Sequence, residues 1–351
     1  MQKLAVFGGT GIIGRSIIEH LETQDDWQGL GVARHDNHIS QSVPFVELDL
    51  LQPELSDAVQ NQFASITHAV YAAYISHEDK FKENELNIQM FRGAIEVLQT
   101  AAPQLKRMVL MQGVKAYGVH LGAFKTPAKE TDPRHLPPNF YYDQEDILRE
   151  TATQQDWEFT ILRPDVVCGF SIGTPMSILL VIAVYAEVCR FYDLPLRFPG
   201  TVGAYNALAQ VTDAELLAKA VLWAATAPRA AGETYNITNG DIFRWKHLWT
   251  QLAAYFDMPV AEPQTISLTA MMADKAAVWK TIQQQYGLKT VAFEDLAAWW
   301  FGDFIFGCDY DVISDTTKVK LHGFQEVVDS SEMFVRLLDR YRAEKIIPPG
   351  K

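Results

Sequence analysis

Hydrophobic and polar residues follow two different rhythms along the first half of the chain. Short apolar runs, typical of strands buried in a parallel sheet, cover residues 4–7, 30–33, 45–48, 69–73, 107–111 and 159–162. Segments with apolar residues three or four positions apart, typical of helices, cover 11–21, 87–100 and 140–153. Because strands and helices alternate, the pattern predicts right-handed crossovers and a parallel sheet with helices on both faces.

The alternation ends after Arg163-Pro164. Beyond it the pattern predicts a buried helix over 177–189, a loop with short strands over 194–206, and a helix over 212–225 capped by Thr212. A further strand is predicted over 233–237, and from Trp245 the chain is helical and rich in aromatic residues.

These elements predict an α/β fold, a Rossmann-type doubly wound parallel sheet with a smaller, mostly helical C-terminal substrate or lid domain. We expect a dinucleotide-binding domain over residues 1–165, with return segments at about 201–240. The substrate or lid domain is expected to comprise residues 166–200 and 241–351.

Composition narrows the functions that such a fold could have. Of the 351 residues, 48% are hydrophobic and 21% are charged, as in ordinary globular proteins, and the net charge is −13. This charge disfavours nucleic-acid binding, which needs a basic face. The most apolar run, 178–186, is too short to span a bilayer, and the first strand begins too close to Met1 for a signal peptide, so we expect a cytoplasmic protein without membrane association. No metal is expected, because neither disulfide nor metal-ligand spacing relates the three cysteines, Cys168, Cys189 and Cys308.

A glycine-rich segment, Gly8-Gly-Thr-Gly-Ile-Ile-Gly14, stands between the first predicted strand and the first predicted helix. In such a turn Gly8 permits the tight bend, Gly11 lets a pyrophosphate approach the backbone, and Gly14 lets the helix pack closely on the strand. The free N–H groups at the helix start would face the phosphates. Glycine-rich turns also occur as purely structural features, but the position of this one in an alternating chain predicts a dinucleotide site.

The end of the second predicted strand indicates which dinucleotide is bound. An acidic residue there would accept from the ribose 2′-hydroxyl of NAD, whereas this chain has Arg34, which can bind the 2′-phosphate of NADP(H). Arg34 could instead be a plain surface cation, but the pattern favours NADP(H). Asp49 could hold the adenine edge or simply stabilise a turn. The other residues expected at the cofactor are Thr10, Ile12, Ile13, His35, Leu50, Ala72 and Val166.

Candidate catalytic residues follow the fifth predicted strand and open the next helix, because ligands bind beyond the carboxyl ends of parallel strands. Lys115 follows the strand, and the pair Tyr141-Tyr142 begins the helix. Ordinary short-chain dehydrogenases carry Tyr-x-x-x-Lys on this helix, but the residue four positions after Tyr142 is Asp146. Taken alone, Tyr142 could be a core tyrosine and Lys115 a solvated loop cation.

The chain resembles the progesterone 5β-reductase and iridoid synthase-like family, an atypical branch of the extended short-chain dehydrogenases. The most specific segments are Asn139-Phe-Tyr-Tyr-x-x-Glu-Asp146 and Trp245-Lys-His247. The matching segments occur in the same order along nearly the whole chain, at 8–14, 31–34, 112–117, 139–148, 163–171, 239–247 and 299–303.

The resemblance implies NADPH-dependent reduction of an activated C=C bond in an enone or enal, by hydride transfer to the β-carbon. It also implies the catalytic pair, a lysine after the fifth strand and the second tyrosine of the pair, here Lys115 and Tyr142. A phenol donor beside a lysine charge stabilises the enolate that forms. By the same matching, Tyr117 and Phe301 are candidate substrate-binding residues, although both could be core aromatics. Family members often form homodimers, so a homodimer is one expected assembly.

Two other functions stay open at this point. The chain could be a carbonyl reductase or a sugar-nucleotide epimerase or dehydratase of the extended type, against which Asp146 in place of the lysine argues. It could also be a non-catalytic NADP(H)-sensing protein, against which Lys115 and Tyr142 argue.

Overall fold

The computed structural model describes residues 1–35, 39–174 and 176–350, which form two compact units. The first unit comprises Met1–Asp165, Ala214–Thr238 and Ser314–Glu326. The second comprises Val166–Asp213, Asn239–Ile313 and Val327–Lys351. The chain therefore passes between the two units several times.

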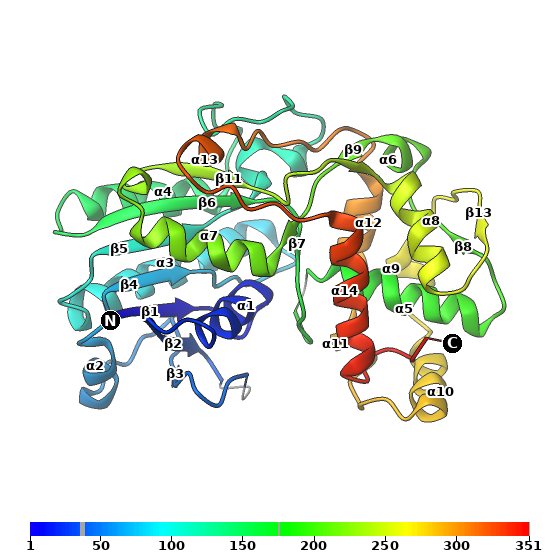
Figure 1. The fold of residues 1–351 in the computed structure, drawn as a ribbon, viewed down its shortest axis with the longest axis horizontal. Helices are drawn as coiled ribbons and strands as arrows, with labels where there is room; N and C mark the ends of the chain where they lie inside the picture. Colours follow the sequence, from blue (N-terminus) through cyan, green and yellow to red (C-terminus); the bar gives the residue numbers. More distant parts are fainter. Residues whose placement is uncertain (36–38, 175, 351) are drawn as a thin grey trace. The chain divides into compact units, whose positions relative to one another are not determined.

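A seven-stranded parallel sheet forms the centre of the first unit. Its order is β11-β6-β5-β4-β1-β2-β3, so the strand order reverses between β1 and β4 (Figure 1). Every residue of β4 and β5 is buried, as expected for central strands covered on both faces. The strands are β1 (Gln2–Phe7), β2 (Trp27–Ala33), β3 (Phe45–Glu47), β4 (His68–Tyr71), β5 (Arg107–Met111), β6 (Glu158–Pro164) and β11 (Thr234–Ile237).

Helices cover both faces of this sheet. On one face α1 (Ile12–Leu21) packs against α7 (Ala214–Thr226), and on the other α3 (Lys80–Ala101) packs against α4 (Phe140–Ala152) (Figure 1). Two short 3-10 helices, η1 (Val114–Tyr117) and η2 (Val119–Leu121), follow β5. The predicted Rossmann-type doubly wound sheet is confirmed.

The second unit is mostly helical, as predicted. Its central helix is α5 (Ile178–Phe191), in which residues 178–189 are all buried and which contacts four other helices of the unit. Because α5 is buried within the protein, its apolar residues are explained by packing and not by contact with a bilayer. The other helices are α6 (Val202–Asn206), α8 (Trp245–Tyr255), α9 (Leu268–Met271), α10 (Ala276–Tyr286), α11 (Phe293–Leu296), α12 (Trp299–Gly307) and α14 (Ser330–Ala343).

The return of the chain into the first unit differs from the expected segment of about 201–240. Residues 201–213 belong to the second unit, because β10 (Thr212–Asp213) pairs there with β7 (Val167–Cys168). Thr212 is thus a strand residue, and the helix that it was expected to cap begins at Ala214. A second return, Ser314–Glu326, joins the first unit because α13 (Thr317–Leu321) packs against β11.

Two short helices were not predicted. In α2 (Asp57–Phe63) only Phe63 is buried, so the segment has no apolar stripe for a pattern to reveal. In the expected loop, α6 (Val202–Asn206) is held at its start by the Thr201 side chain, which accepts from the Ala204 amide. Both helices depend on local capping more than on apolar periodicity.

Candidate active site

The reversal of strand order between β1 and β4 places the turns after these strands next to each other. In doubly wound sheets, ligands bind in the crevice at this reversal, outside the carboxyl ends of the strands. The turn after β1 carries the glycine-rich segment, the turn after β4 carries Ala72, and the turn after the neighbouring β5 carries Lys115. The predicted residues of the first unit therefore follow adjacent strand ends.

The three spaced glycines of the first turn meet three different steric requirements. Gly8 has φ +84°, and a Cβ on it would lie 2.7 Å from the Ala73 amide nitrogen. A Cβ on Gly14 would lie 2.2 Å from the Gly8 carbonyl oxygen, so only glycine fits there. At Gly11 the nearest atom to such a Cβ is 3.5 Å away, and no side chain caps the start of α1. The turn is closely packed at Gly8 and Gly14 and open at Gly11, a shape that fits a pyrophosphate at the start of α1.

The other predicted cofactor residues of the first unit lie around these strand ends. Arg34 and His35 are exposed at the end of β2, where a guanidinium is free to reach a phosphate. After β3, one Asp49 carboxylate oxygen accepts from the Leu51 amide at 3.0 Å and holds a turn. Leu50 is buried beneath that turn, and the partly buried residues are Thr10, Ile12, Ile13 and Ala72. The residues present thus fit a dinucleotide.

Lys115 lies in η1 with its side chain partly buried. Its ammonium nitrogen is 5.7 Å from the centre of the Tyr74 ring, a residue that follows β4 by three positions. Burial lowers the pKa of Lys115, the nearby Glu83 carboxylate opposes this effect, and Lys80 adds to it. Sequence spacing gave no sign of Tyr74 or Glu83, because both reach the lysine from another part of the chain.

Tyr142 is a buried residue whose hydroxyl is occupied by the backbone. The hydroxyl donates to the Ala116 carbonyl oxygen at 2.8 Å and accepts from the His135 amide at 2.9 Å. The Arg134 guanidinium lies 5.0 Å from the ring centre. These contacts join η1, the loop before α4 and α4 itself. They also use the one hydrogen that the Tyr142 hydroxyl can donate.

Tyr141 is placed differently. A Cβ built on Gly113 would lie 3.4 Å from the Tyr141 hydroxyl oxygen, so this phenol reaches the loop that carries Lys115. Its ring lies 4.7 Å from Phe140, and Phe140 lies 5.9 Å from Tyr74, the ring under the lysine. Burial raises the pKa of Tyr141, and Glu83 raises it further, so the phenol keeps its proton.

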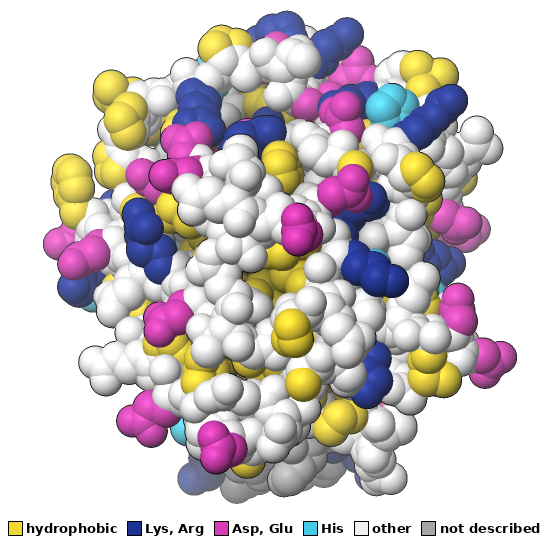
Figure 2. Space-filling view, turned by 90° about the vertical axis from the view of Figure 1, so that its left-hand side faces the viewer, with side chains coloured by type: hydrophobic (Ala, Val, Ile, Leu, Met, Phe, Trp, Pro, Cys, Tyr) yellow, Lys and Arg dark blue, Asp and Glu magenta, His cyan; other side chains and the backbone are white. Residues whose placement is uncertain are grey.

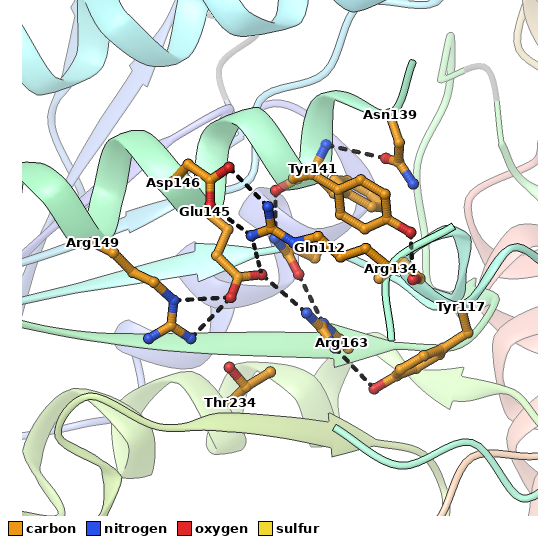
Figure 3. Close-up of polar contacts among 12 residues, drawn as sticks. Gln112, Tyr117, Arg134, Asn139, Tyr141, Glu145, Asp146, Arg149, Arg163 and Thr234 are labelled. Carbon is orange, nitrogen blue, oxygen red and sulfur yellow. Dashed lines mark hydrogen bonds and ion pairs between the residues drawn. The ribbon is translucent and has the colours of Figure 1, made fainter. Parts of the chain in front are cut away.

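A buried polar network lies beside the tyrosine pair (Figure 3). The Arg163 guanidinium, at the end of β6, donates to Gln112 at 2.8 Å, to the Tyr117 hydroxyl at 3.3 Å and to Glu145 at 3.0 Å. Tyr117 in turn donates to Asn236 at 2.5 Å and is only 2% exposed. Burial raises the pKa of Tyr117 to about 12, against the opposing effect of Arg163. These contacts favour a structural role for Tyr117 over the predicted contact with substrate.

Two predicted residues belong to the second unit. The Val166 carbonyl oxygen accepts from the Thr212 amide at 2.9 Å, next to the β7 and β10 pair. Phe301 lies in α12 and is part of the unit's buried hydrophobic core. The core position explains Phe301 without a ligand, which was the alternative reading of this aromatic residue.

Three observations bear on other classes of site. Within residues 1–35, 39–174 and 176–350, no group of three or more His, Cys, Asp and Glu side chains could hold a metal ion. No helix in the described part of the chain is both long and apolar enough to cross a bilayer. On the face drawn in Figure 2, basic and acidic side chains are interspersed.

Residues 47–348 match the family of PRISE-like Rossmann-fold domains. The chain belongs to this family. Among its relatives are the (S)-8-oxocitronellyl enol synthase of Nepeta cataria, 33% identical over 98% of this chain and 92% of the relative, and the 3-oxo-Delta(4,5)-steroid 5-beta-reductase of Arabidopsis thaliana, 32% identical with the same coverage. The resemblance drawn from the sequence is confirmed.

Solved structures show the same fold at lower identity. UDP-glucose 4-epimerase of Thermotoga maritima has a TM-score of 0.67 at 15% identity and covers 97% of this PRISE-like chain and 99% of its own. A short-chain dehydrogenase/reductase superfamily protein of Agrobacterium tumefaciens, solved with NAD, has a TM-score of 0.68 at 14% identity and covers 98% of both chains. This similarity shows that the chain shares its fold with these proteins.

Gly14→Ala should destabilise the protein by about 1–3 kcal/mol, because its methyl group would overlap the Gly8 carbonyl oxygen. The matched control is Gly11→Ala, where the added methyl has room; its stability should stay within about 0.5 kcal/mol of wild type while its affinity for a nicotinamide dinucleotide falls. Urea unfolding measures the first effect, and fluorescence titration with NADH and NADPH measures the second. Equal unfolding midpoints for Gly14→Ala and wild type would contradict the packing argument.

Tyr142→Phe should lower the free energy of unfolding by about 1–2 kcal/mol, because the buried Ala116 carbonyl and the His135 amide both lose their partner. Tyr141→Phe should lower the free energy of unfolding by less. Comparing the two variants by thermal denaturation cancels the effect common to the loss of any tyrosine hydroxyl. A larger loss of stability in Tyr141→Phe would contradict the structural importance of the two Tyr142 hydrogen bonds.

Proposed function

We propose that the chain is an NADPH-dependent reductase of C=C bonds conjugated to a carbonyl group, acting on a small enone or enal. The names of two relatives point to this chemistry: one denotes an enol product, and the other denotes reduction at C5 of a 3-oxo steroid with a Delta(4,5) double bond. The observation that carries the proposal is that the tyrosine pair lies against the turn that carries Lys115: the Tyr142 hydroxyl donates to the carbonyl of Ala116, next to the lysine, and the Tyr141 hydroxyl lies beside Gly113.

The reaction requires charge stabilisation at one oxygen atom. When bound, NADPH supplies the hydride to the β-carbon of the substrate. Negative charge then develops on the carbonyl oxygen, and a hydrogen-bond donor with a positive charge beside it lowers the barrier. In this chain, Lys115 supplies the charge and one tyrosine of the pair supplies the donor. No lysine on α4 is needed for this task, because Lys115 comes from the loop.

The matching to the family gives Tyr142 as the donor, and we keep this assignment, with Tyr141 as the alternative. In the structure the Tyr142 hydroxyl is bonded to two backbone groups, so a substrate oxygen would have to replace the Ala116 carbonyl as its acceptor. The Tyr141 hydroxyl lies beside Gly113, which has no side chain to fill the space next to it. A raised pKa keeps the Tyr141 phenol neutral, as a donor to an oxyanion must be.

The choice of NADPH is supported by charge at the end of β2. Arg34 is exposed there, and a guanidinium can bind a 2′-phosphate with two parallel hydrogen bonds. Asp49, after β3, already accepts a backbone hydrogen bond and is left with one carboxylate oxygen for the adenine edge. The two residues have distinct tasks at the adenosine end of the cofactor.

Oxidation of NADPH by 2-cyclohexen-1-one, followed at 340 nm, tests the function and the donor together. Wild type should form the saturated ketone and prefer NADPH to NADH. Tyr142→Phe and Lys115→Met should each lower kcat by about 10²-fold or more, whereas Tyr141→Phe should lower it less than about tenfold. If Tyr141→Phe is the more damaging tyrosine variant, the donor is Tyr141. NADPH binding without reduction of any enone would refute the reductase function.

The pKa of Lys115 sets a limit on activity at high pH. Burial lowers this pKa, so the ammonium is lost at a lower pH than in a free lysine, and kcat/KM should fall as pH rises through that value. In Lys115→Arg the fall should move to higher pH, because a guanidinium stays charged. A pH profile from 6 to about 11 measures the shift. Superimposable profiles would show that another group causes the fall.

A further inference from the structure

The segment after β4 is fastened to α3 by two buried side chains. Asn87 accepts from the Ile75 amide at 3.0 Å and donates to the Ile75 carbonyl oxygen at 2.8 Å. One turn earlier on α3, a Glu83 carboxylate oxygen accepts from the His77 amide at 3.0 Å. Asn87 is fully buried, and Glu83 is 4% exposed. Residues 75–77 therefore have a fixed path along the start of α3.

This path places the Tyr74 ring against the proposed catalytic lysine. The Lys115 ammonium lies 5.7 Å from the centre of the ring, and the Phe140 ring, at the start of α4, lies 5.9 Å from it. An ammonium over the face of an aromatic ring is attracted by the negative charge of that face. Tyr74 thus lies against both η1 and the helix of the tyrosine pair.

The Glu83 carboxylate and the Lys115 ammonium act on each other by their charges. Burial lowers the pKa of Lys115, and the Glu83 charge opposes that effect. Burial raises the pKa of Glu83, but hydrogen bonds from His77 and Lys80, together with nearby positive charges, lower it by more. Lys115 supplies one of these positive charges. Each of the two groups therefore stabilises the charged form of the other.

Glu83 supplies the negative charge that acts on Lys115. The second charged group that acts on the ammonium, Lys80, is positive and also belongs to α3. Burial raises the pKa values of the phenols on the neighbouring segments and lowers that of the imidazole, so these groups stay neutral at and above neutral pH. The phenols are those of Tyr74 and Tyr141, and the imidazole is that of His120 in η2. The Tyr142 hydroxyl donates its hydrogen to a backbone carbonyl.

Two Lys–Glu pairs of α3 have the same spacing but different surroundings. Lys80 pairs with the buried Glu83 at 2.9 Å, so it neutralises part of the charge that acts on Lys115. Lys82 pairs with Glu85 at 2.8 Å, but the Glu85 side chain is 66% exposed. Because water and salt screen an exposed charge, Glu85 should act only weakly on Lys115. The second pair is therefore a matched control for the first.

We propose that Glu83 is a positioning residue for Lys115: its buried carboxylate keeps the ammonium charged, and its hydrogen bond to the segment after β4 keeps the Tyr74 ring against that ammonium. The inference rests on the proposed function, in which Lys115 supplies a positive charge, and it is the same for either tyrosine as the donor. A buried lysine without such a carboxylate would lose its proton more readily and could then no longer stabilise an enolate.

The first test compares the pH profiles of kcat/KM for Glu83→Gln, Lys80→Met and Glu85→Gln. Glutamine can still accept from the His77 amide, so Glu83→Gln removes mainly the charge. The fall in kcat/KM at high pH should move to lower pH in Glu83→Gln and to higher pH in Lys80→Met. At a fixed pH within the fall, each should differ from wild type by about threefold or more, in opposite directions. Glu85→Gln should match wild type.

Opposite shifts cannot result from structural damage, because a damaged site would lower kcat/KM at every pH. The Lys80 side chain is mostly exposed, so Lys80→Met should fold even if Glu83→Gln does not. Equal displacement of the profile in Glu83→Gln and Glu85→Gln would show that only the net charge of the protein acts, and it would overturn the proposal. A Lys80→Met profile displaced to lower pH would also overturn it.

A readout without turnover distinguishes this proposal from the function on which it rests. Lysines are methylated reductively with 13C-formaldehyde, the Lys115 signal is assigned by its absence in Lys115→Arg, and its pKa is measured by NMR titration. This pKa should fall in Glu83→Gln, rise in Lys80→Met and stay unchanged in Glu85→Gln. If it stays unchanged in the first two variants, the proposal fails even if wild type reduces enones. If it shifts as expected and wild type reduces no enone, the proposed function fails and the pairing of Glu83 with Lys115 stands.

Discussion

Much of the geometry around the tyrosine pair depends on the contact between the guanidinium of Arg163 and the carboxylate of Glu145. Both groups are buried, so removing Glu145 would leave the charge of Arg163 in a poorly polarisable interior. The pair joins a strand of the sheet to the helix of the tyrosines, and through Gln112 it reaches the loop of Lys115. An ion pair of this kind contributes little net stability, but it admits very few arrangements of the elements that it connects.

The glycine turn after β1 is constrained by sterics. The backbone of the β1 turn approaches its neighbours so closely that a single methyl group at Gly8 or Gly14 would overlap them. The last four residues of β1 and all of β4 are buried, so the turn cannot relax by moving away. The segments that follow neighbouring strand ends are thus held by different means, close packing after β1 and side-chain hydrogen bonds after β5.

Much of this could be predicted from the sequence, because apolar periodicity and glycine spacing are local signals. The parallel sheet, the glycine turn and the lysine after β5 were all found in this way. The hydrogen bonds of Tyr142 could not be, because they involve the carbonyl of Ala116 and the amide of His135, which are backbone groups without any sequence signature. The burial of Tyr117 could not be predicted either, because its partners Arg163 and Asn236 lie 46 and 119 residues away along the chain. The contacts of Arg163, next to last in β6, were not predicted either, because its partners Gln112, Tyr117 and Glu145 lie in other segments of the chain.

The interleaving of the two units has a consequence for the order in which the protein can be made. The seventh strand of the first unit, β11, is Thr234–Ile237, and the last segment of that unit is Ser314–Glu326. During synthesis, β6 therefore leaves the ribosome long before the strand that will pair with its outer edge. The nascent chain exposes an unpaired sheet edge while about 70 further residues are added. Neither unit can be complete before the other is nearly finished, so the two must mature together.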